Sequence, residues 1–354
     1  MLNIKINKTA NKKIKPPPSD MLFGKNFSDH MFLMDYNTDN GWHNARIEPY
    51  GELSFEPSTM VFHYGQELFE GLKAYKTRTG EVQLFRAQKN VERMNMTNER
   101  LCIPQIDPDY ALEAIKAIVR CDIDWVPDET DYSLYIRPFI IATDPFLGVR
   151  ASNTYLFCII LSPVGAYYPE GINPVKIYVE HEYVRAVKGG IGYVKAGGNY
   201  AASLKAQAKA KELGYTQVLW LDAIERKYID EVGTMNVFFV IDNKIITPSL
   251  DGSILPGVTR DSTICILKEW GYTVEERKLA LSEVIEAAGN NKLNEAFGTG
   301  TAAVISPIGI LNNAGNIIEI NNSEIGTLTQ RLYDTITGIQ YGSIEDTRNW
   351  IEKL

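Results

Sequence analysis

A stretch dense in proline and glycine, SPVGAYYPEGINP at 162–174, separates two segments that each alternate strand-like and helix-like patterns. Proline and glycine clustered in this way favour a loop over a helix or strand. Each flanking segment is long enough for a domain of ordinary size. The sequence therefore predicts a mixed α/β (α+β) protein with a smaller N-terminal domain over 1–161, an interdomain loop over 162–174 and a larger C-terminal domain over 175–354.

The N-terminal segment has runs rich in β-branched and aromatic residues, which predict strands at 53–65, 82–86, 132–143 and 154–161. Its helical patterns predict helices at 87–101 and 108–120. In the C-terminal segment the same criteria predict strands at 174–180, 216–222, 235–241, 244–248 and 301–311. Helices are predicted there at 202–214, 259–271, 282–289 and 323–342, and a hairpin turn at Asp242-Asn243-Lys244.

Charge and hydropathy narrow the classes of partner. The net charge of −8 argues against a nucleic-acid surface. No apolar run approaches the roughly 20 residues that a membrane-spanning helix needs. We therefore expect neither nucleic acid nor membrane as a partner. Lysines are concentrated in the first 15 residues, ahead of three prolines, and predict a flexible tail over 1–20.

Cysteine and histidine usage excludes two kinds of site. The four cysteines are scattered without a C-x-x-C motif, which is typical of reduced thiols in a cytoplasmic protein. The four histidines show no metal-ligand spacing, so we expect no metal and a proton carrier other than histidine.

The stretch GGIGYVKAGGNYAAS at 189–203 surrounds Lys195 with five glycines. A Walker-type phosphate loop needs Ser or Thr after the lysine, and Ala196 stands there. A flexible turn rarely needs five glycines, each of which costs about 0.5–1 kcal/mol relative to alanine. The remaining interpretation is a nucleophilic amine beside a flat cofactor, where glycines let the ring approach the backbone.

Three further motifs in the same segment suit pyridoxal phosphate. Glu231 stands just before a strand, where a carboxylate could keep a proton on the cofactor's ring nitrogen. ILPGVTRDS at 254–262 places a glycine turn directly before a helix, a geometry that binds phosphate; a capping role for Thr259 is the alternative. FGTGTAAV at 297–304 is a second small-residue segment suited to anions.

The chain resembles the branched-chain amino-acid aminotransferases, fold type IV pyridoxal-phosphate enzymes of class IV. The motifs that carry the resemblance are FHYGQELFEGLKAY, NVERMN, YIRPF, SPVGAYYPEG, RAVKGGIGYVKAGGNYAASL, EVGTMNVFFV, LPGVTR and FGTGTA. They occur in the family's order between about residues 60 and 305.

The resemblance implies Lys195 as the Schiff-base and catalytic lysine. It also implies a set of residues that bind the cofactor: Arg93, Tyr200, Glu231, Thr234, Val258, Thr259 and Thr301. In that set Arg93 and the backbone of Val258 and Thr259 grip the phosphate, and Tyr200 bonds the phenolic oxygen. Arg185 lies in a family motif without an assigned role.

For the substrate the resemblance implies Tyr64, Phe69, Tyr135, Arg137 and Ala302. Phe69 and the other aromatic rings would form an apolar wall for leucine, isoleucine and valine side chains. Tyr64 and the Ala302 amide would meet the α-carboxylate. Arg137 would recognise the second carboxylate of glutamate or 2-oxoglutarate.

The implied activity is transfer of an amino group from a branched-chain amino acid to 2-oxoglutarate by a homodimer. A loop of the neighbouring subunit, near 144–149, would complete the site. Rival interpretations are a D-amino-acid aminotransferase, an aminodeoxychorismate lyase and a ligand-binding protein that lost the chemistry. Mammalian relatives carry a C-x-x-C pair where this chain has Ala303 and Ser306, so no thiol switch is expected.

Overall fold

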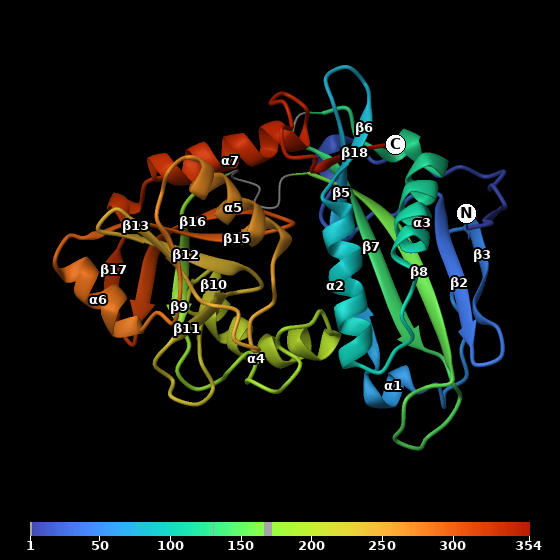
Figure 1. The fold of residues 1–354 in the computed structure, drawn as a ribbon, viewed down its shortest axis with the longest axis horizontal. Helices are drawn as coiled ribbons and strands as arrows, with labels where there is room; N and C mark the ends of the chain where they lie inside the picture. The colour runs from blue at the N-terminus through green and yellow to red at the C-terminus, as the bar shows by residue number, and fades with distance from the viewer. Residues whose placement is uncertain (1, 130, 166–171) are drawn as a thin grey trace. The chain divides into compact units, whose positions relative to one another are not determined.

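The computed structural model describes residues 2–129, 131–165 and 172–354, and the chain divides into two compact units (Figure 1). Unit 1 comprises Met1–Tyr167, Lys195–Gly197 and Gly338–Leu354, and unit 2 comprises Tyr168–Val194 and Gly198–Thr337. The expected boundaries at 161 and 175 differ from this division, because they assign Lys195–Gly197 and Gly338–Leu354 to the C-terminal domain. With these segments added, the first unit is not the smaller one.

Unit 1 is built on a sheet that has nine strands within the described ranges. These are β1 (Lys5–Ile6), β2 (His30–Asn37), β3 (Gly41–Pro49), β4 (Glu67–Phe69), β5 (Leu72–Lys76), β6 (Val82–Phe85), β7 (Ser133–Ala142), β8 (Thr154–Val164) and β18 (Ile351–Lys353). Their order is β1-β3-β2-β8-β7-β5-β6-β18, with β4 paired to β7. The long antiparallel strands β7 and β8 are buried along most of their length and form the centre of the unit's core.

The helices of unit 1 are α1 (Val61–Tyr64), α2 (Ala87–Arg100) and α3 (Pro108–Cys121). The predicted helix at 108–120 is confirmed. It begins where Asp107 accepts the backbone N–H groups of Asp109 and Tyr110, with Pro108 at the first helical position. Its apolar face, including Ile115 and Ile118, is buried in the same core as the sheet.

The strand predicted at 53–65 is wrong. Thr59 turns back on Glu56, whose carbonyl accepts both the backbone N–H and the hydroxyl of Thr59 at 3.0 and 2.6 Å. The chain then forms the single turn of α1, which ends at Gly65 in the left-handed conformation with φ of 57°. The aromatic residues that suggested a strand belong to this loop and helix.

Residues near the N-terminus are tied to unit 1, contrary to the expected flexible tail. β1 pairs in parallel with β3. The Thr9 N–H donates to His30 Nε2 at 2.9 Å, and the Lys13 N–H donates to the Asp29 carboxylate at 2.8 Å. Hydrogen bonds from backbone N–H groups to buried side chains therefore order this N-terminal segment, although its composition alone indicated disorder.

Unit 2 is built on a second sheet, again of nine strands within the described ranges. These are β9 (Val175–Val179), β10 (Gln217–Leu221), β11 (Ile229–Val232), β12 (Asn236–Ile241), β13 (Lys244–Thr247), β14 (Val274–Glu276), β15 (Leu293–Gly300), β16 (Val304–Asn313) and β17 (Asn316–Glu319). Their order is β11-β10-β9-β16-β15-β12-β13-β14, with β17 paired to β16. The hairpin turn between β12 and β13 is confirmed: Asp242 and Asn243 both have positive φ, as a type I′ turn requires.

The remaining helices are α4 (Gly197–Glu212), α5 (Val258–Glu269), α6 (Leu281–Gly289) and α7 (Thr327–Gln340). β18 follows α7 and pairs with β6, which is why the C-terminus belongs to unit 1. β8 continues through Val164, into the loop expected at 162–174, and residues 166–171 of that loop lie outside the described residues. In the part of the chain that the structure describes, no helix has both the length and the apolar character to cross a bilayer.

Candidate active site

Lys195 lies half-buried in unit 1, and hydrogen bonds of its backbone groups hold it in place. Its N–H donates to Thr97 Oγ1 at 3.1 Å, and its carbonyl accepts the N–H of Phe69 at 3.1 Å. Its Nζ lies 4.7 Å from the centre of the Phe69 ring. Because α2 supplies Thr97 and β4 supplies Phe69, two elements fix the backbone from which the amine extends.

Arg93, the expected phosphate residue, is held by a glutamate that the sequence did not single out. Its Nε and Nη2 donate to the two carboxylate oxygens of Glu70, both at 2.8 Å. Both side chains are buried, with 7% and 1% exposed. Burial opposes the ionisation of Glu70, yet Arg93, with smaller contributions from Lys195 and Asn90, holds the pKa of that carboxyl below its usual range. The position of the guanidinium is thus set by a paired charge.

The expected substrate residues of β4 and β7 share one face of the sheet. The register pairs Glu67 with Ile141 and Phe69 with Phe139, so residues 67, 69, 135 and 137 all project to the same side. The Arg137 guanidinium lies 4.6 Å from the Phe69 ring and 5.2 Å from the Tyr135 ring, and Nη2 donates to the Tyr135 hydroxyl at 2.9 Å. Arg137 Nε is buried without a hydrogen-bond partner in the described structure.

Tyr64 lies at the end of α1 and is 38% exposed. Its hydroxyl donates to the carbonyl of Leu147, in the loop after β7. The loop expected at 144–149 to reach a neighbouring subunit is thus tied to an expected substrate residue of the same unit.

In unit 2, Glu231 is the third residue of β11, and its buried carboxylate, 4% exposed, lies beside the guanidinium of Arg185. Arg185 Nε lies 3.0 Å from Glu231 Oε2. The N–H of Leu255 donates to Oε1 at 3.0 Å, and Asn236 Nδ2 lies 3.4 Å from the same oxygen. The guanidinium and the carboxylate form a buried ion pair, with 8% and 4% of the side chains exposed. This pairing supplies a structural role for Arg185, which the sequence left open.

Tyr200 and Thr234 line a small cavity of unit 2 together with Arg185 and Glu231. Thr234 lies in the turn between β11 and β12, where Gly233 has φ of 57° and Trp220 Nε1 donates to the Gly233 carbonyl at 2.8 Å. A residue with a side chain in place of Gly233 would be strained at this positive φ. The structure therefore brings Tyr200, Glu231 and Thr234 together on one cavity.

Val258 and Thr259 are the first two residues of α5. The N-cap is Gly257, no side chain caps the helix, and Thr259 is buried inside it, so the alternative capping role of Thr259 is wrong. A Cβ on Gly257 would lie 2.1 Å from Asn236 Oδ1, so the turn before α5 packs tightly against the Asn236 side chain. The same side chain donates from Nδ2 to the Leu255 carbonyl at 2.9 Å. A helix N-terminus without a side-chain cap suits a phosphate.

Thr301 and Ala302 lie half-buried in the turn between β15 and β16. Nearby on β15, the hydroxyl of Thr299 is buried without a hydrogen-bond partner in the described structure. Thr299 pairs in register with Asn236, which places this end of β15 beside the Glu231 network.

The glycines around Lys195 have local conformational and packing roles that do not involve a cofactor. Gly189 has φ of 85°, the left-handed conformation of a turn. A Cβ on Gly192 would lie 2.4 Å from the Ser253 carbonyl oxygen. The carbonyls of Gly192 and Ser253 both accept hydrogen bonds from Arg185 Nη2. A Cβ on Gly197 would lie 1.8 Å from Glu67 Oε1. Turn geometry and close packing therefore explain at least three of these glycines.

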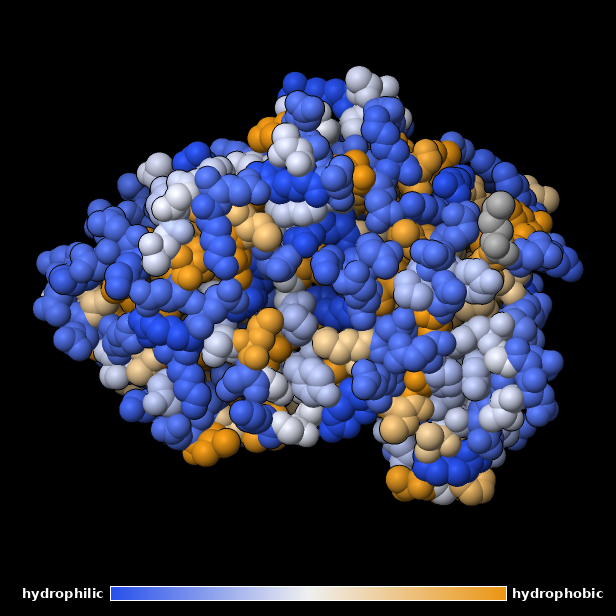
Figure 2. Space-filling view, viewed as in Figure 1, coloured by the Kyte–Doolittle hydropathy of each residue, from blue (hydrophilic) through white to orange (hydrophobic). Residues whose placement is uncertain are grey.

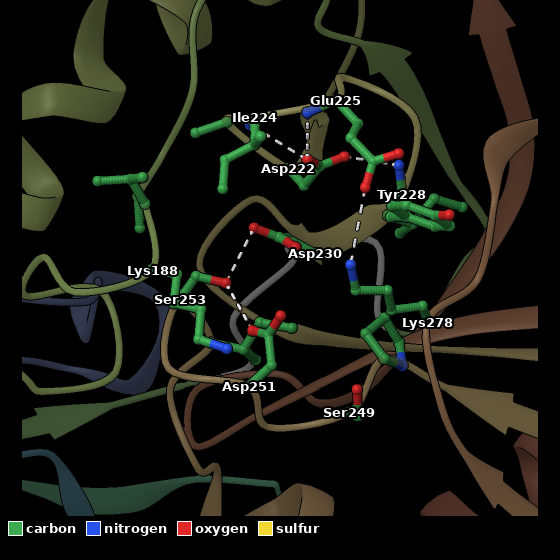
Figure 3. A pocket seen from close by; sticks show the side chains of 16 residues that line it. Lys188, Asp222, Ile224, Glu225, Tyr228, Asp230, Ser249, Asp251, Ser253 and Lys278 are labelled. Atoms are coloured by element: carbon green, nitrogen blue, oxygen red, sulfur yellow. Dashed lines mark hydrogen bonds and ion pairs between the residues drawn. The ribbon is translucent and has the colours of Figure 1, made fainter.

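A second cavity of unit 2, about 170 Å³, lies on the other side of β11 from Glu231. Asp230 faces it and is 6% exposed (Figure 3). The Ser253 hydroxyl lies 3.3 Å from Asp230 Oδ2 and 3.1 Å from Asp251 Oδ1, so two carboxylates share one donor hydrogen. Burial raises the pKa of Asp230 to about 7, Arg185 opposes this rise, and neighbouring carboxylates add to it.

One group of possible metal ligands occurs among the described residues: His30, Cys121 and Asp122 in unit 1. Both ring nitrogens of His30 are already engaged, Nε2 by the Thr9 N–H and Nδ1 by Asp122. This arrangement ties the N-terminal segment to the core.

Comparison with known proteins agrees with the motifs. The family model described as "Amino-transferase class IV" matches residues 67–311. Branched-chain-amino-acid aminotransferase 2 of Bacillus subtilis (strain 168) is 59% identical over 351 residues, which cover 99% of this chain and 97% of that protein. The crystal structure of the Escherichia coli branched-chain amino acid aminotransferase superposes with a TM-score of 0.76 at 27% identity, covering 92% of this chain and 98% of that one. The Thermobaculum terrenum enzyme of the same name, solved in its PLP-form, shares the fold, with a TM-score of 0.74 at 24% identity, covering 92% and 98%. The chain therefore belongs to the class IV amino-transferases, which are pyridoxal-phosphate enzymes.

Proposed function

We propose that the protein is a branched-chain-amino-acid transaminase, which moves the amino group of L-leucine, L-isoleucine or L-valine to 2-oxoglutarate. The observation that carries the proposal is the 59% identity, over nearly the whole of both chains, to a protein of that name. Lys195, Glu231 and Arg93 are all present, which argues against a binding protein that has lost its chemistry.

The residues of unit 2 fit pyridoxal phosphate. Glu231 is a buried carboxylate paired with Arg185, suited to a protonated ring nitrogen. The uncapped start of α5, at Val258 and Thr259, suits the phosphate. The Thr299 hydroxyl, which has no hydrogen-bond partner among the described residues, marks a free polar position beside this network. We assign the remaining roles as the motifs imply: Tyr200 to the phenolic oxygen, with Thr234 and Thr301 lining the cofactor.

In unit 1 we assign the reacting amine to Lys195 and a phosphate contact to Arg93. When bound, the cofactor supplies an electron-withdrawing ring that delocalises the charge developing at the substrate's Cα. Lys195 Nζ takes the proton from that Cα and later donates a proton as the acid. The Lys195 backbone donates to the Thr97 hydroxyl and accepts from the Phe69 N–H, and these two hydrogen bonds limit the directions from which the amine can act. Glu231 keeps a proton at the ring nitrogen throughout.

For the substrate we assign the apolar wall to Phe69 and Tyr135, and the α-carboxylate to Tyr64 and the amide of Ala302. Arg137 receives the second carboxylate of glutamate or 2-oxoglutarate. The stacking of Arg137 on two aromatic rings holds its guanidinium in place, and its buried Nε has no acceptor within the described ranges of the chain. A fixed cation at the edge of an apolar wall suits a pocket that must take both kinds of side chain.

We further propose a cytoplasmic homodimer. Apolar side chains are exposed on unit 1 over α1 and the loop after β7 (Figure 2). The most exposed of them are Phe62 and Leu147, at 62% each, and Val149 at 86%. An apolar patch of this kind marks an interaction surface. Sedimentation at several protein concentrations tests the dimer, and Val149→Asp with Leu147→Asp should shift the protein towards monomer; a wild-type monomer would refute it.

The activity is tested by initial rates with 2-oxoglutarate as acceptor. Leucine, isoleucine and valine should each give the 2-oxo acid and glutamate, and D-alanine and an aromatic amino acid should be much slower. A faster rate with D-alanine would favour a D-amino-acid aminotransferase. No turnover, in a protein that binds pyridoxal phosphate, would favour a binding protein.

A further inference from the structure

We propose that Glu67 determines how strongly the site accepts dicarboxylate substrates, and that it also positions the Lys195 segment. The inference rests on the proposed function, in which Arg137 receives the second carboxylate of glutamate or 2-oxoglutarate. Glu67 lies inside the motif FHYGQELFEG, and the motif alone assigns it no role in binding or catalysis.

The first observation is how β4 holds the lysine segment. The Phe69 N–H donates to the Lys195 carbonyl at 3.1 Å. Two residues earlier on the same face of the strand, the Glu67 carboxylate accepts the backbone N–H of Gly197. The contact is so close that an added Cβ on Gly197 would lie 1.8 Å from Oε1. Glu67 and Phe69 therefore anchor the segment on both sides of Ala196.

The second observation is the electrostatic link to Arg137. Glu67, Phe69 and Arg137 share one face of the sheet because β4 and β7 are in antiparallel register. Burial raises the pKa of Glu67, and the Gly197 N–H and the Arg137 charge oppose that rise. The carboxylate and the guanidinium thus act on each other inside a half-buried region, where charges are only partly screened.

The consequence differs between the two substrate classes. A branched-chain amino acid brings an apolar side chain and adds no charge beside Arg137. A dicarboxylate brings a second anion to the same guanidinium, and an ionised Glu67 repels it and competes for the positive charge. Glu67 therefore lowers the affinity for dicarboxylates and leaves the branched-chain substrates nearly unaffected.

The test compares Glu67→Gln with wild-type holoenzyme. Glutamine keeps the shape and an oxygen that can accept the Gly197 N–H, and it removes the charge. We expect the KM for 2-oxoglutarate to fall about fivefold, while kcat/KM for leucine changes by less than about twofold. Glu67→Ala also removes the acceptor, so kcat should fall with both substrate classes. Glu99→Gln removes an exposed carboxylate of α2 and should leave all these constants unchanged.

A binding measurement without turnover separates the possible outcomes. Glutarate should raise the unfolding temperature of Glu67→Gln holoenzyme more than that of wild type, and 4-methylpentanoate should raise both equally. An unchanged or raised dicarboxylate KM in Glu67→Gln, or equal changes for both substrate classes, would overturn the role of Glu67. The role of Arg137 is tested separately by Arg137→Ala, which should raise the 2-oxoglutarate KM at least about tenfold. If it does not, the substrate assignment fails whatever the result for Glu67.

Discussion

Replacing Asp230 with asparagine should make the protein more stable above neutral pH. Asp230 faces the cavity beside β11 with only 6% of its surface exposed, and it shares the single Ser253 hydroxyl hydrogen with Asp251 (Figure 3). Burial raises its pKa to about 7, against 3.8 for an ordinary aspartate. Arg185 opposes the shift, and Glu231 and Asp251 add to it. An ionised Asp230 is therefore costly in the folded protein.

Proton linkage gives the sign and size of the change in the free energy of unfolding. Because the folded pKa lies above the unfolded one, the folded state binds more protons between about pH 4 and 7, and stability falls as pH rises through this window. The contribution is fully present below the unfolded pKa and lost above the folded one. A shift of this size corresponds to about 4 kcal/mol if it belonged to Asp230 alone. Neighbouring carboxylates share it, so we expect about 2 kcal/mol.

The assay is the unfolding temperature of holoenzyme between pH 5 and 8.5. Asp230→Asn keeps an acceptor for Ser253 and cannot ionise, so its advantage over wild type should be small at pH 5 and grow to about 3 °C at pH 8.5. Asp242→Asn changes an exposed aspartate in the β12–β13 turn and should run parallel to wild type. An Asp230→Asn advantage that is the same at both ends of the pH range would refute the reasoning.

Two further predictions concern the site. Lys195→Ala should lower transaminase turnover at least about 1000-fold and remove the absorbance of the lysine-bound cofactor, with the circular dichroism unchanged; retained activity would refute its assignment. Gly71→Ala places a Cβ 2.2 Å from the Tyr135 hydroxyl, which accepts from Arg137. Displacing that hydroxyl should raise the 2-oxoglutarate KM about tenfold and the leucine KM much less, and equal effects on both would contradict the proposed roles.

Local patterns predicted most elements of unit 2 and the longer elements of unit 1. The hairpin at Asp242-Asn243 and the helix at 108–120 depend on neighbours in sequence, so turn chemistry and capping were sufficient. The strand wrongly predicted at 53–65 shows the limit of composition, since aromatic residues also occur in a loop and a short helix such as α1. The pairing of β18 with β6 depends on contacts across most of the chain, and no local pattern carries it.

The site shows the same division between local and distant information. Lys195, Glu231 and the start of α5 are proposed as site residues from the sequence because the motif residues themselves suit the chemistry. Their partners could not be predicted in this way: Glu70 positions Arg93 and Arg185 lies against Glu231, each across a long separation in sequence. A charged side chain can be identified from its motif, but its ionisation and direction depend on what is buried beside it. Differences in substrate preference among such enzymes should therefore be sought in these supporting carboxylates and arginines, of which Glu67 is the one that the substrate's second charge would encounter.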